Sequence, residues 1–156
     1  MTEQRRIRVV AAILEPGPGA PAIPEDWRAP ASHAEGQGGM WLLARKAAGK
    51  KLAGLWELPG GKIEADESAG AALEREIAEE LGLVVEAGDW VATSEFAYDF
   101  GVVVLEGWRA RVVGGTWRLV DHDLLAWVDA ANAGHFELAP ADVPLLGALL
   151  ANAGNV

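Results

Sequence analysis

Cysteine is absent from this sequence of 156 residues. Disulfide bonds and thiolate-bound metals are therefore excluded. Apolar runs are also short, and none approaches the roughly 20 residues that a membrane-spanning helix needs. The N-terminus gives no secretory signal, because Arg5, Arg6 and Arg8 interrupt it and the apolar stretch at 9–14 is too short. We therefore expect a cytoplasmic protein with no membrane partner.

Basic residues are scarce: 13 lysines and arginines stand against 23 aspartates and glutamates, for a formal net charge of −10. This balance disfavours binding to polymeric nucleic acid, which requires cationic groups that displace counterions. A small anionic substrate would have to be held by local cations and a metal. The length suits one domain with its own core, so we expect 1–156 to be a single domain, present as a monomer or homodimer.

Apolar and turn-forming residues together outline the elements of the chain. They predict a final helix at 143–151 and strands at 7–14, 41–44, 84–91, 93–98, 102–113, 117–120 and 125–128. Between the first two strands, at about 15–39, proline, glycine and alanine dominate and predict a long surface loop. Strands around one acidic helix and a final helix predict an α+β or three-layer α/β/α class.

A glycine-rich turn and a helix occupy the middle of the chain. The turn, 58–61, ends in two consecutive glycines, which allow backbone angles that other residues avoid. Asp66 and Ser68 are both suitable helix caps, because their short side-chain oxygens accept the free N–H groups of a first turn. Residues 69–81 are strong helix formers, and Gly82 is a natural C-terminal stop. A helix over 69–81 is therefore predicted.

The predicted helix has an apolar stripe beside an acidic face. The stripe consists of Leu73, Ile77 and Leu81. The acidic face consists of Glu76, Glu79 and Glu80. Glu76 and Glu80 form an i,i+4 like-charge pair, which destabilises an isolated helix. A divalent cation among the acids would relieve this repulsion, and hard carboxylate oxygens suit Mg²⁺, with Mn²⁺ as a substitute.

The segment from Gly61 to Leu83 resembles the Nudix box, the signature of hydrolases that cut nucleoside diphosphates linked to another group. Gly61 is followed after five residues by Glu67, and Glu67 after seven residues by Arg75-Glu76-Ile77-Ala78-Glu79-Glu80-Leu81-Gly82-Leu83, without a gap or substitution. The resemblance implies a Nudix-like α/β/α sandwich, a mixed β-sheet between helices, in which the box helix lines a metal site.

Further stretches resemble the MutT-type branch of this family, which hydrolyses nucleoside triphosphates to a monophosphate and pyrophosphate. They are 42–46, 53–62 and 138–146, the last being similar to the segment from which these enzymes contact the base. Only the 15–39 loop stands outside the resemblance, as an apparent insertion. The implied activity is Mg²⁺-dependent hydrolysis of a small-molecule nucleotide, in nucleotide-pool sanitation or turnover.

The resemblance also implies individual roles. The metal ligands would be Glu76, Glu79 and Glu80 with the Gly60 carbonyl. Arg75 would orient one of these glutamates, and Glu67 would cap or bond within the loop–helix unit. Lys46 and Lys62 would face phosphates. Leu58 would form the floor under the base, and Asp142 would hydrogen-bond to the base edge. Either Glu76 or Glu79 would accept a proton from the attacking water.

Two positions depart from the MutT pattern. The founding MutT enzyme has an asparagine where Asp142 falls, whereas aspartate is typical of relatives that prefer cytidine nucleotides and of some that remove oxidised guanine. An ionised carboxylate accepts the exocyclic amine of cytosine, so (d)CTP is the predicted substrate, with oxidised dGTP second. Ala126 replaces an acidic residue of MutT, so an extra ligand or base would come from Asp121, His122 or Asp123.

Two other functions stay open at this point. The enzyme would hydrolyse another nucleoside diphosphate derivative, such as ADP-ribose or a dinucleoside polyphosphate, if the likeness to the MutT branch misleads. A non-catalytic nucleotide-binding Nudix module is the second alternative. The three intact glutamates of the box disfavour it, because such modules usually have broken acidic positions.

Overall fold

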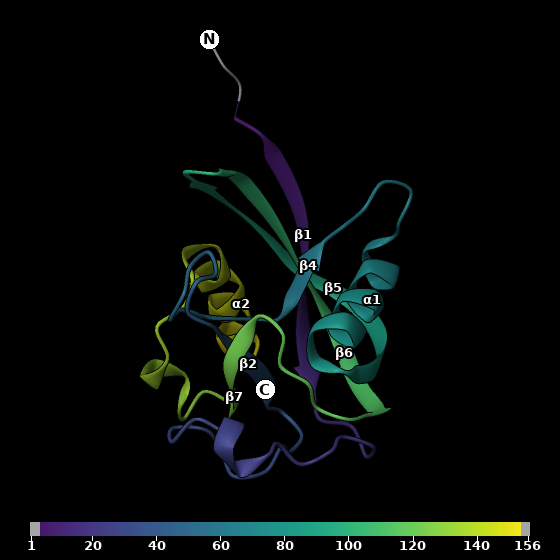
Figure 1. The fold of residues 1–156 in the computed structure, drawn as a ribbon, viewed down its shortest axis with the longest axis vertical. Coiled ribbons are helices and arrows are strands. Elements are labelled where there is room, and N and C mark those ends of the chain that lie inside the picture. Colours follow the sequence, from purple (N-terminus) through teal and green to yellow (C-terminus); the bar gives the residue numbers. More distant parts are fainter. Residues whose placement is uncertain (1–3, 154–156) are drawn as a thin grey trace.

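The computed structural model describes residues 4–153, which form two β-sheets, two α-helices and three 3₁₀ turns (Figure 1). The helices are α1 (Ala69–Leu81) and α2 (Val143–Ala153). The strands are β1 (Arg6–Glu15), β2 (Trp41–Lys46), β3 (Trp56–Glu57), β4 (Gly60–Lys62), β5 (Leu83–Tyr98), β6 (Gly101–Gly115) and β7 (His122–Val128). The 3₁₀ turns are η1 (Glu25–Trp27), η2 (Ala133–His135) and η3 (Pro140–Asp142). Neither helix of the described part is long and apolar enough to cross a membrane.

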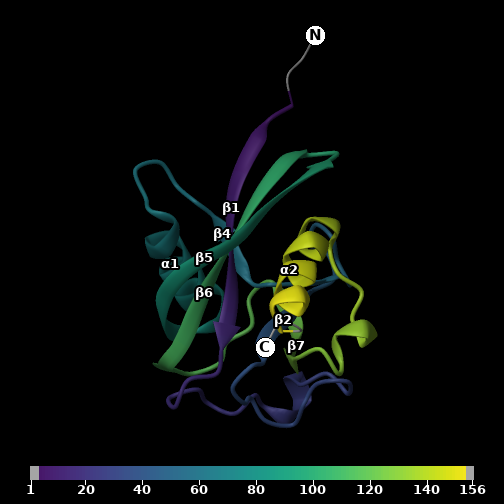
Figure 2. The ribbon, with the colours of Figure 1, turned by 180° about the vertical axis from the view of Figure 1, so that it is seen from behind.

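The larger sheet is mixed and has the strand order β4-β1-β6-β5. β1 runs parallel to β6, while β1–β4 and β5–β6 are antiparallel pairs. β5 and β6 form a long hairpin whose tip extends away from α1 (Figures 1 and 2). Helix α1 lies on one side of this sheet and α2 on the other, which confirms the predicted α+β class and Nudix-like α/β/α sandwich.

The smaller sheet is antiparallel, with the order β3-β2-β7. The segment between β1 and β2 bonds to the outer edge of β7. The N–H of Ala29 donates to the Leu125 carbonyl at 2.9 Å, and the N–H of His33 donates to the Trp127 carbonyl at 3.1 Å. The segment predicted as a surface loop is therefore fixed to a sheet edge by backbone hydrogen bonds.

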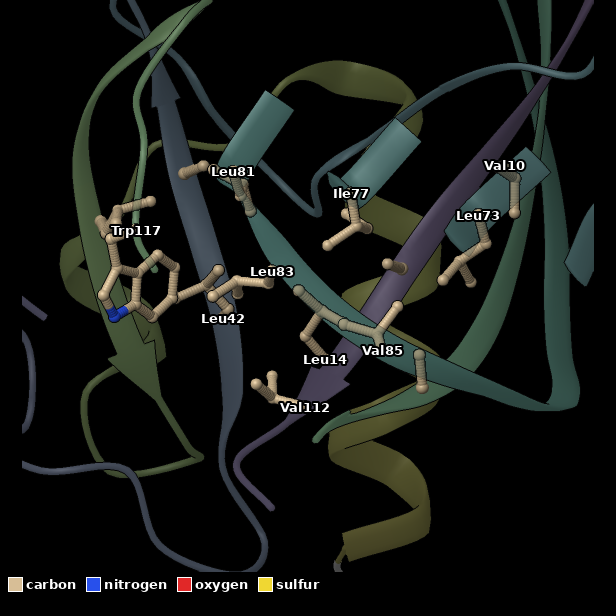
Figure 3. Packing of buried hydrophobic residues seen from close by; sticks show 14 of the residues in the cluster. Val10, Leu14, Leu42, Leu73, Ile77, Leu81, Leu83, Val85, Val112 and Trp117 are labelled. Atoms are coloured by element: carbon tan, nitrogen blue, oxygen red, sulfur yellow. The ribbon is translucent and has the colours of Figure 1, made fainter. Parts of the chain in front are cut away.

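Helix α1 begins and ends as its sequence predicts. Of the two candidate caps, Ser68 performs the role, since its hydroxyl accepts the N–H of Ala71 at 3.1 Å. Gly82 ends the helix in the left-handed conformation, with φ 72°. The predicted apolar stripe is fully buried, and Figure 3 shows it packed toward β1 and β5. Complete burial of one leucine side chain contributes about 1.5–3 kcal/mol, so this stripe fixes the acidic face relative to the sheet.

Two strand predictions need correction. The segments 84–91 and 93–98 were predicted as separate strands but belong to one strand, β5, whose register shifts near Trp90. Residues 117–120 were predicted as a strand and form none. The reason is that neighbouring backbone groups bond to the end of α1 instead of to a strand: the N–H of Arg118 donates to the Leu81 carbonyl at 2.9 Å.

Candidate functional site

The glycine pair at the start of the box lies against two different neighbours. Gly60 is opposite Ala11 in the β1–β4 pairing, and a Cβ at Gly60 would lie 1.8 Å from the Val10 carbonyl oxygen. A Cβ at Gly61 would lie 2.2 Å from the carboxyl carbon of Glu76. Both positions therefore require glycine, the first to allow strand pairing and the second to make room for a carboxylate of α1.

Arg75 joins the box into one unit. Its guanidinium donates to both carboxylate oxygens of Glu67, at 2.7 and 2.9 Å, and to the Lys62 carbonyl at 3.1 Å. A further N–H donates to Glu76 at 2.8 Å. The hydrogen bonds from Arg75, followed by one from the Glu64 N–H, lower the pKa of Glu67 to about 2. Arg75 and Glu67 thus hold the loop to the helix, and Arg75 contacts two of the predicted metal ligands, Glu76 at 2.8 Å and Glu79 at 3.4 Å.

Glu76 and Glu80 are the two partly buried acids of α1. Burial raises the pKa of Glu76, against the opposing effect of the Arg75 guanidinium. Burial, followed by the neighbouring Asp121 carboxylate, raises the pKa of Glu80 to about 7. The Oε2 atom of Glu80 is buried and has no hydrogen-bond partner among residues 4–153. For buried carboxyl groups beside other acids, the ionised form is unfavourable unless a cation lies close to them.

The donor set fits a hard divalent cation, because it consists of crowded carboxylates with one orphaned buried oxygen. The convergence is incomplete, however. The Glu79 side chain is 60% exposed and its carboxylate lies 3.4 Å from Arg75. Within residues 4–153, no three acidic or histidine side chains come together at one point. The four-part ligand set of Gly60, Glu76, Glu79 and Glu80 stays a prediction.

The structure distinguishes the three residues proposed to replace the acid missing at Ala126. Asp123 forms a two-pronged hydrogen bond with Arg45, at 2.8 and 3.0 Å. His122 is buried, and its Nε2 lies 2.9 Å from a carboxylate oxygen of Glu57. Asp121 is the one beside Glu80, and its 2.9 Å ion pair with Lys50 lowers its pKa. Asp121 is therefore the additional acid nearest the predicted metal ligands.

The two predicted phosphate-binding lysines differ in their surroundings. Lys46, at the end of β2, lies close enough to Glu80 and Asp121 for its charge to favour their ionised forms. Lys62, in β4, is exposed, and its carbonyl accepts the hydrogen bond from Arg75. Both lysines thus flank the acidic helix, and their contact with phosphate stays a prediction.

The predicted base-binding residues meet each other directly. The N–H of Leu58 donates to Oδ1 of Asp142 at 2.9 Å, and both side chains are buried. Burial, followed by the charge of Glu57, raises the pKa of Asp142 well above its ordinary value, against the lowering effect of the Leu58 N–H. The predicted preference for (d)CTP took Asp142 as ionised, whereas burial and the charge of Glu57 favour its protonated form.

Three polar residues near Asp142 were not predicted from the sequence. Glu57 raises the pKa of this carboxyl, while Ser94 and Tyr98 of β5 hydrogen-bond to the neighbouring Ala141. Alternation along β5 would have placed Ser94 and Tyr98 on one face of the strand. No local pattern indicates that this face meets residues more than 40 positions further along the chain.

Comparisons with known proteins agree with this geometry. The model of the NUDIX domain matches residues 29–148. The CTP pyrophosphohydrolase of Escherichia coli K12 is 41% identical over 113 residues, which cover 72% of this chain and 84% of the relative. A putative 8-oxo-dGTP diphosphatase 2 of Mycobacterium tuberculosis is 44% identical over 104 residues, covering 65% of this chain and 72% of the relative.

Two solved structures have a fold similar to that of this chain. The solution structure of the E. coli ORF135 protein has a TM-score of 0.71 and 35% identity, covering 97% of this chain and 94% of the other. The crystal structure of a MutT protein from Methanosarcina mazei Go1 has a TM-score of 0.74 at 23% identity, covering both chains completely, and supports the fold alone. Because the family model spans most of the chain and the box is complete, this chain belongs to the Nudix family of hydrolases.

Proposed function

We propose that this Nudix hydrolase cleaves nucleoside triphosphates to a nucleoside monophosphate and pyrophosphate with Mg²⁺, and that (d)CTP or 8-oxo-dGTP is its substrate. The observation that carries the proposal is the 58–61 turn. At one end the Leu58 N–H bonds to Asp142, and at the other Gly61 lies against Glu76. Three residues of extended chain span at most about 10 Å, so the turn keeps the proposed base-binding residue near the predicted metal ligands.

The choice of base is supported by Asp142. The carboxyl of Asp142 can hydrogen-bond to the cytosine edge, which offers an exocyclic amine beside N3. Oxidised guanine offers N7–H beside O6, which matches the same group. The two relatives named for CTP and 8-oxo-dGTP support these two bases equally.

Several residues would contribute to the proposed hydrolysis. Glu76, Glu79, Glu80 and the Gly60 carbonyl would hold Mg²⁺, which when bound neutralises phosphate oxygens and lowers the pKa of a bound water. The lysines Lys46 and Lys62 would add positive charge toward the phosphates as negative charge develops on them. Arg75 would keep the Glu76 carboxylate in place, as its 2.8 Å hydrogen bond suggests. Glu76 or Glu79 would accept the proton of the attacking water.

The test is a digest of CTP, dCTP and 8-oxo-dGTP with purified protein and Mg²⁺, separated by chromatography. We expect the monophosphate and pyrophosphate to appear in equal amounts, and no products with excess chelator. A nucleoside diphosphate with inorganic phosphate as the main products would contradict the proposed position of cleavage. Hydrolysis of ADP-ribose in preference to all three nucleotides would contradict the substrate class.

A further inference from the structure

The backbone of Ala141, directly before the proposed base-binding residue Asp142, is held by two side chains of β5. The N–H of Ala141 donates to the Tyr98 hydroxyl at 2.9 Å. The Ala141 carbonyl accepts from the Ser94 hydroxyl at 2.5 Å. Both polar groups of one peptide residue are therefore bonded by side chains, from positions more than 40 residues earlier in the chain.

The two hydroxyl groups lie in surroundings that restrict their movement. Ser94 is 7% exposed. The Tyr98 ring stacks on Phe100 with a centroid distance of 5.0 Å and an interplanar angle of 6°, and it contacts Phe96 at 4.7 Å. Phe100 in turn lies 4.3 Å below the ammonium group of Lys51. Packing against Phe96 and Phe100 thus restricts the Tyr98 ring and holds its hydroxyl in position.

Asp142 itself makes two other hydrogen bonds. Its Oδ1 accepts the Leu58 N–H, and its own N–H donates to the Ala139 carbonyl at 3.0 Å. Ala139 is itself bonded to the Trp56 carbonyl of β3. Within the 139–142 segment, β3 of the smaller sheet therefore holds Ala139, and β5 of the larger sheet holds Ala141. A carboxyl that distinguishes bases needs this kind of support, because a small misplacement removes the selectivity of a hydrogen bond.

We propose that Ser94 and Tyr98 are specificity-positioning residues, which hold Ala141 so that the Asp142 carboxyl is aimed at the substrate base. They act through Asp142 and do not touch the base themselves. The inference rests on the proposed function, since it takes Asp142 to meet the base. It makes the β5–β6 hairpin part of substrate selection, although the metal-binding box contributes nothing to that contact.

The experiment measures kcat and KM for CTP, UTP, 8-oxo-dGTP and dGTP with wild type, Tyr98→Phe and Ser94→Ala. Selectivity is the ratio of kcat/KM between the best and the worst nucleotide. Each variant should lower this ratio by about threefold to tenfold, the range of one net hydrogen bond, through a higher KM of the best nucleotide. The kcat of the worst nucleotide should stay within twofold of wild type. Ser94→Thr, which keeps a hydroxyl, and Glu95→Gln, whose exposed side chain pairs with Arg6 and takes no part in holding Ala141, are the matched controls and should keep the wild-type ratio.

The decisive arm repeats Tyr98→Phe in an Asp142→Ala background. A residue that acts only through Asp142 has no further effect once the carboxyl is gone, so the double variant should have the selectivity of Asp142→Ala alone. An additional loss in the double variant would show that Tyr98 contacts the base directly and would overturn the positioning role. Unchanged selectivity in both single variants would overturn it as well.

The wild-type measurements alone test the proposed function, independently of the variants. A wild-type protein that leaves all four nucleotides uncut would refute the activity. One that cuts them with equal efficiency would show that Asp142 does not select a base, and the inference would fall with it. A selective wild type whose variants keep that selectivity refutes only the role of Ser94 and Tyr98.

Discussion

Replacing Gly61 by alanine should impair the predicted metal site and leave the fold largely intact. The added Cβ would lie 2.2 Å from the Glu76 carboxyl carbon, whereas real Cβ contacts essentially never fall below 3.0 Å. The carboxylate must therefore move by at least 0.8 Å, the difference of these two distances. This movement also disturbs the 2.8 Å hydrogen bond from Arg75. Because a misplacement of about 1 Å can reduce a rate by about 100-fold, we expect Gly61→Ala to lose about that factor in kcat.

Stability should change much less. The atoms that must give way belong to the end of a flexible side chain, and an off-rotamer glutamate costs about 0.5–1.5 kcal/mol. Alanine also restricts the unfolded chain, which offsets about 0.4–1 kcal/mol of this cost, since Gly61 does not adopt a positive φ. The net loss of at most about 1 kcal/mol corresponds to a Tm shift of about 2–4 °C for a chain of this size.

Gly60→Ala is the matched control. Its Cβ would meet the backbone oxygen of Val10 at 1.8 Å, and no side-chain rotation relieves that contact. The pairing of β4 with β1 must open, so we expect a loss of about 3 kcal/mol and a Tm decrease of about 6 °C or more. Thermal unfolding and pyrophosphate release over a Mg²⁺ titration compare the two variants. A Gly61→Ala protein with wild-type turnover and wild-type Mg²⁺ dependence would refute the close approach of the turn to Glu76.

Three further predictions concern acidic residues. Glu80→Gln should reduce kcat by about 100-fold with an unchanged far-UV spectrum, because it removes a charged ligand and keeps the shape; activity within tenfold of wild type at saturating Mg²⁺ would exclude the ligand role. Asp121→Asn should reduce kcat about tenfold or more, because Asp121 lies beside Glu80. The kcat of Asp123→Asn should stay within about twofold of wild type, because its partner is the half-exposed Arg45. Equal losses in the two variants would contradict the assignment of Asp121. Glu67→Gln should lower the urea midpoint at pH 7, and this difference from wild type should shrink as the pH falls from about 4.5 through about 2. The reason is that a carboxyl whose pKa is lowered by folding stabilises the folded state only while it is ionised. A difference that persists at pH 2 would show that Arg75 does not act through charge.

Local rules explain why so much of the box could be predicted from sequence. The Ser68 cap, the Gly82 stop and the buried stripe depend on residues within one or two helical turns of each other. Their effects are therefore visible without knowledge of the tertiary fold. The predicted bounds of this helix, 69–81, are the observed ones.

The predictions that failed concern features that depend on contacts between residues far apart in the sequence. Residues 117–120 have a pattern typical of strands, yet the Arg118 N–H finds its acceptor at the end of α1. The pKa of Asp142 is raised by burial and then by the charge of Glu57, which lies 85 positions earlier in the chain and reaches it only through tertiary packing. The choice of Asp121 over its two neighbours likewise required the position of Glu80.

The segment between β1 and β2 has a further consequence for the behaviour of the protein in solution. An outer strand such as β7 exposes a row of backbone donors and acceptors that would recruit the same strand of another molecule. Ala29 and His33 occupy acceptors of this row, and a Cβ at Gly36 would come within 2.7 Å of the Trp127 indole, so the segment lies directly on the strand. This segment, rich in proline and glycine, thus protects the edge of β7 from edge-to-edge aggregation, independently of any role in catalysis.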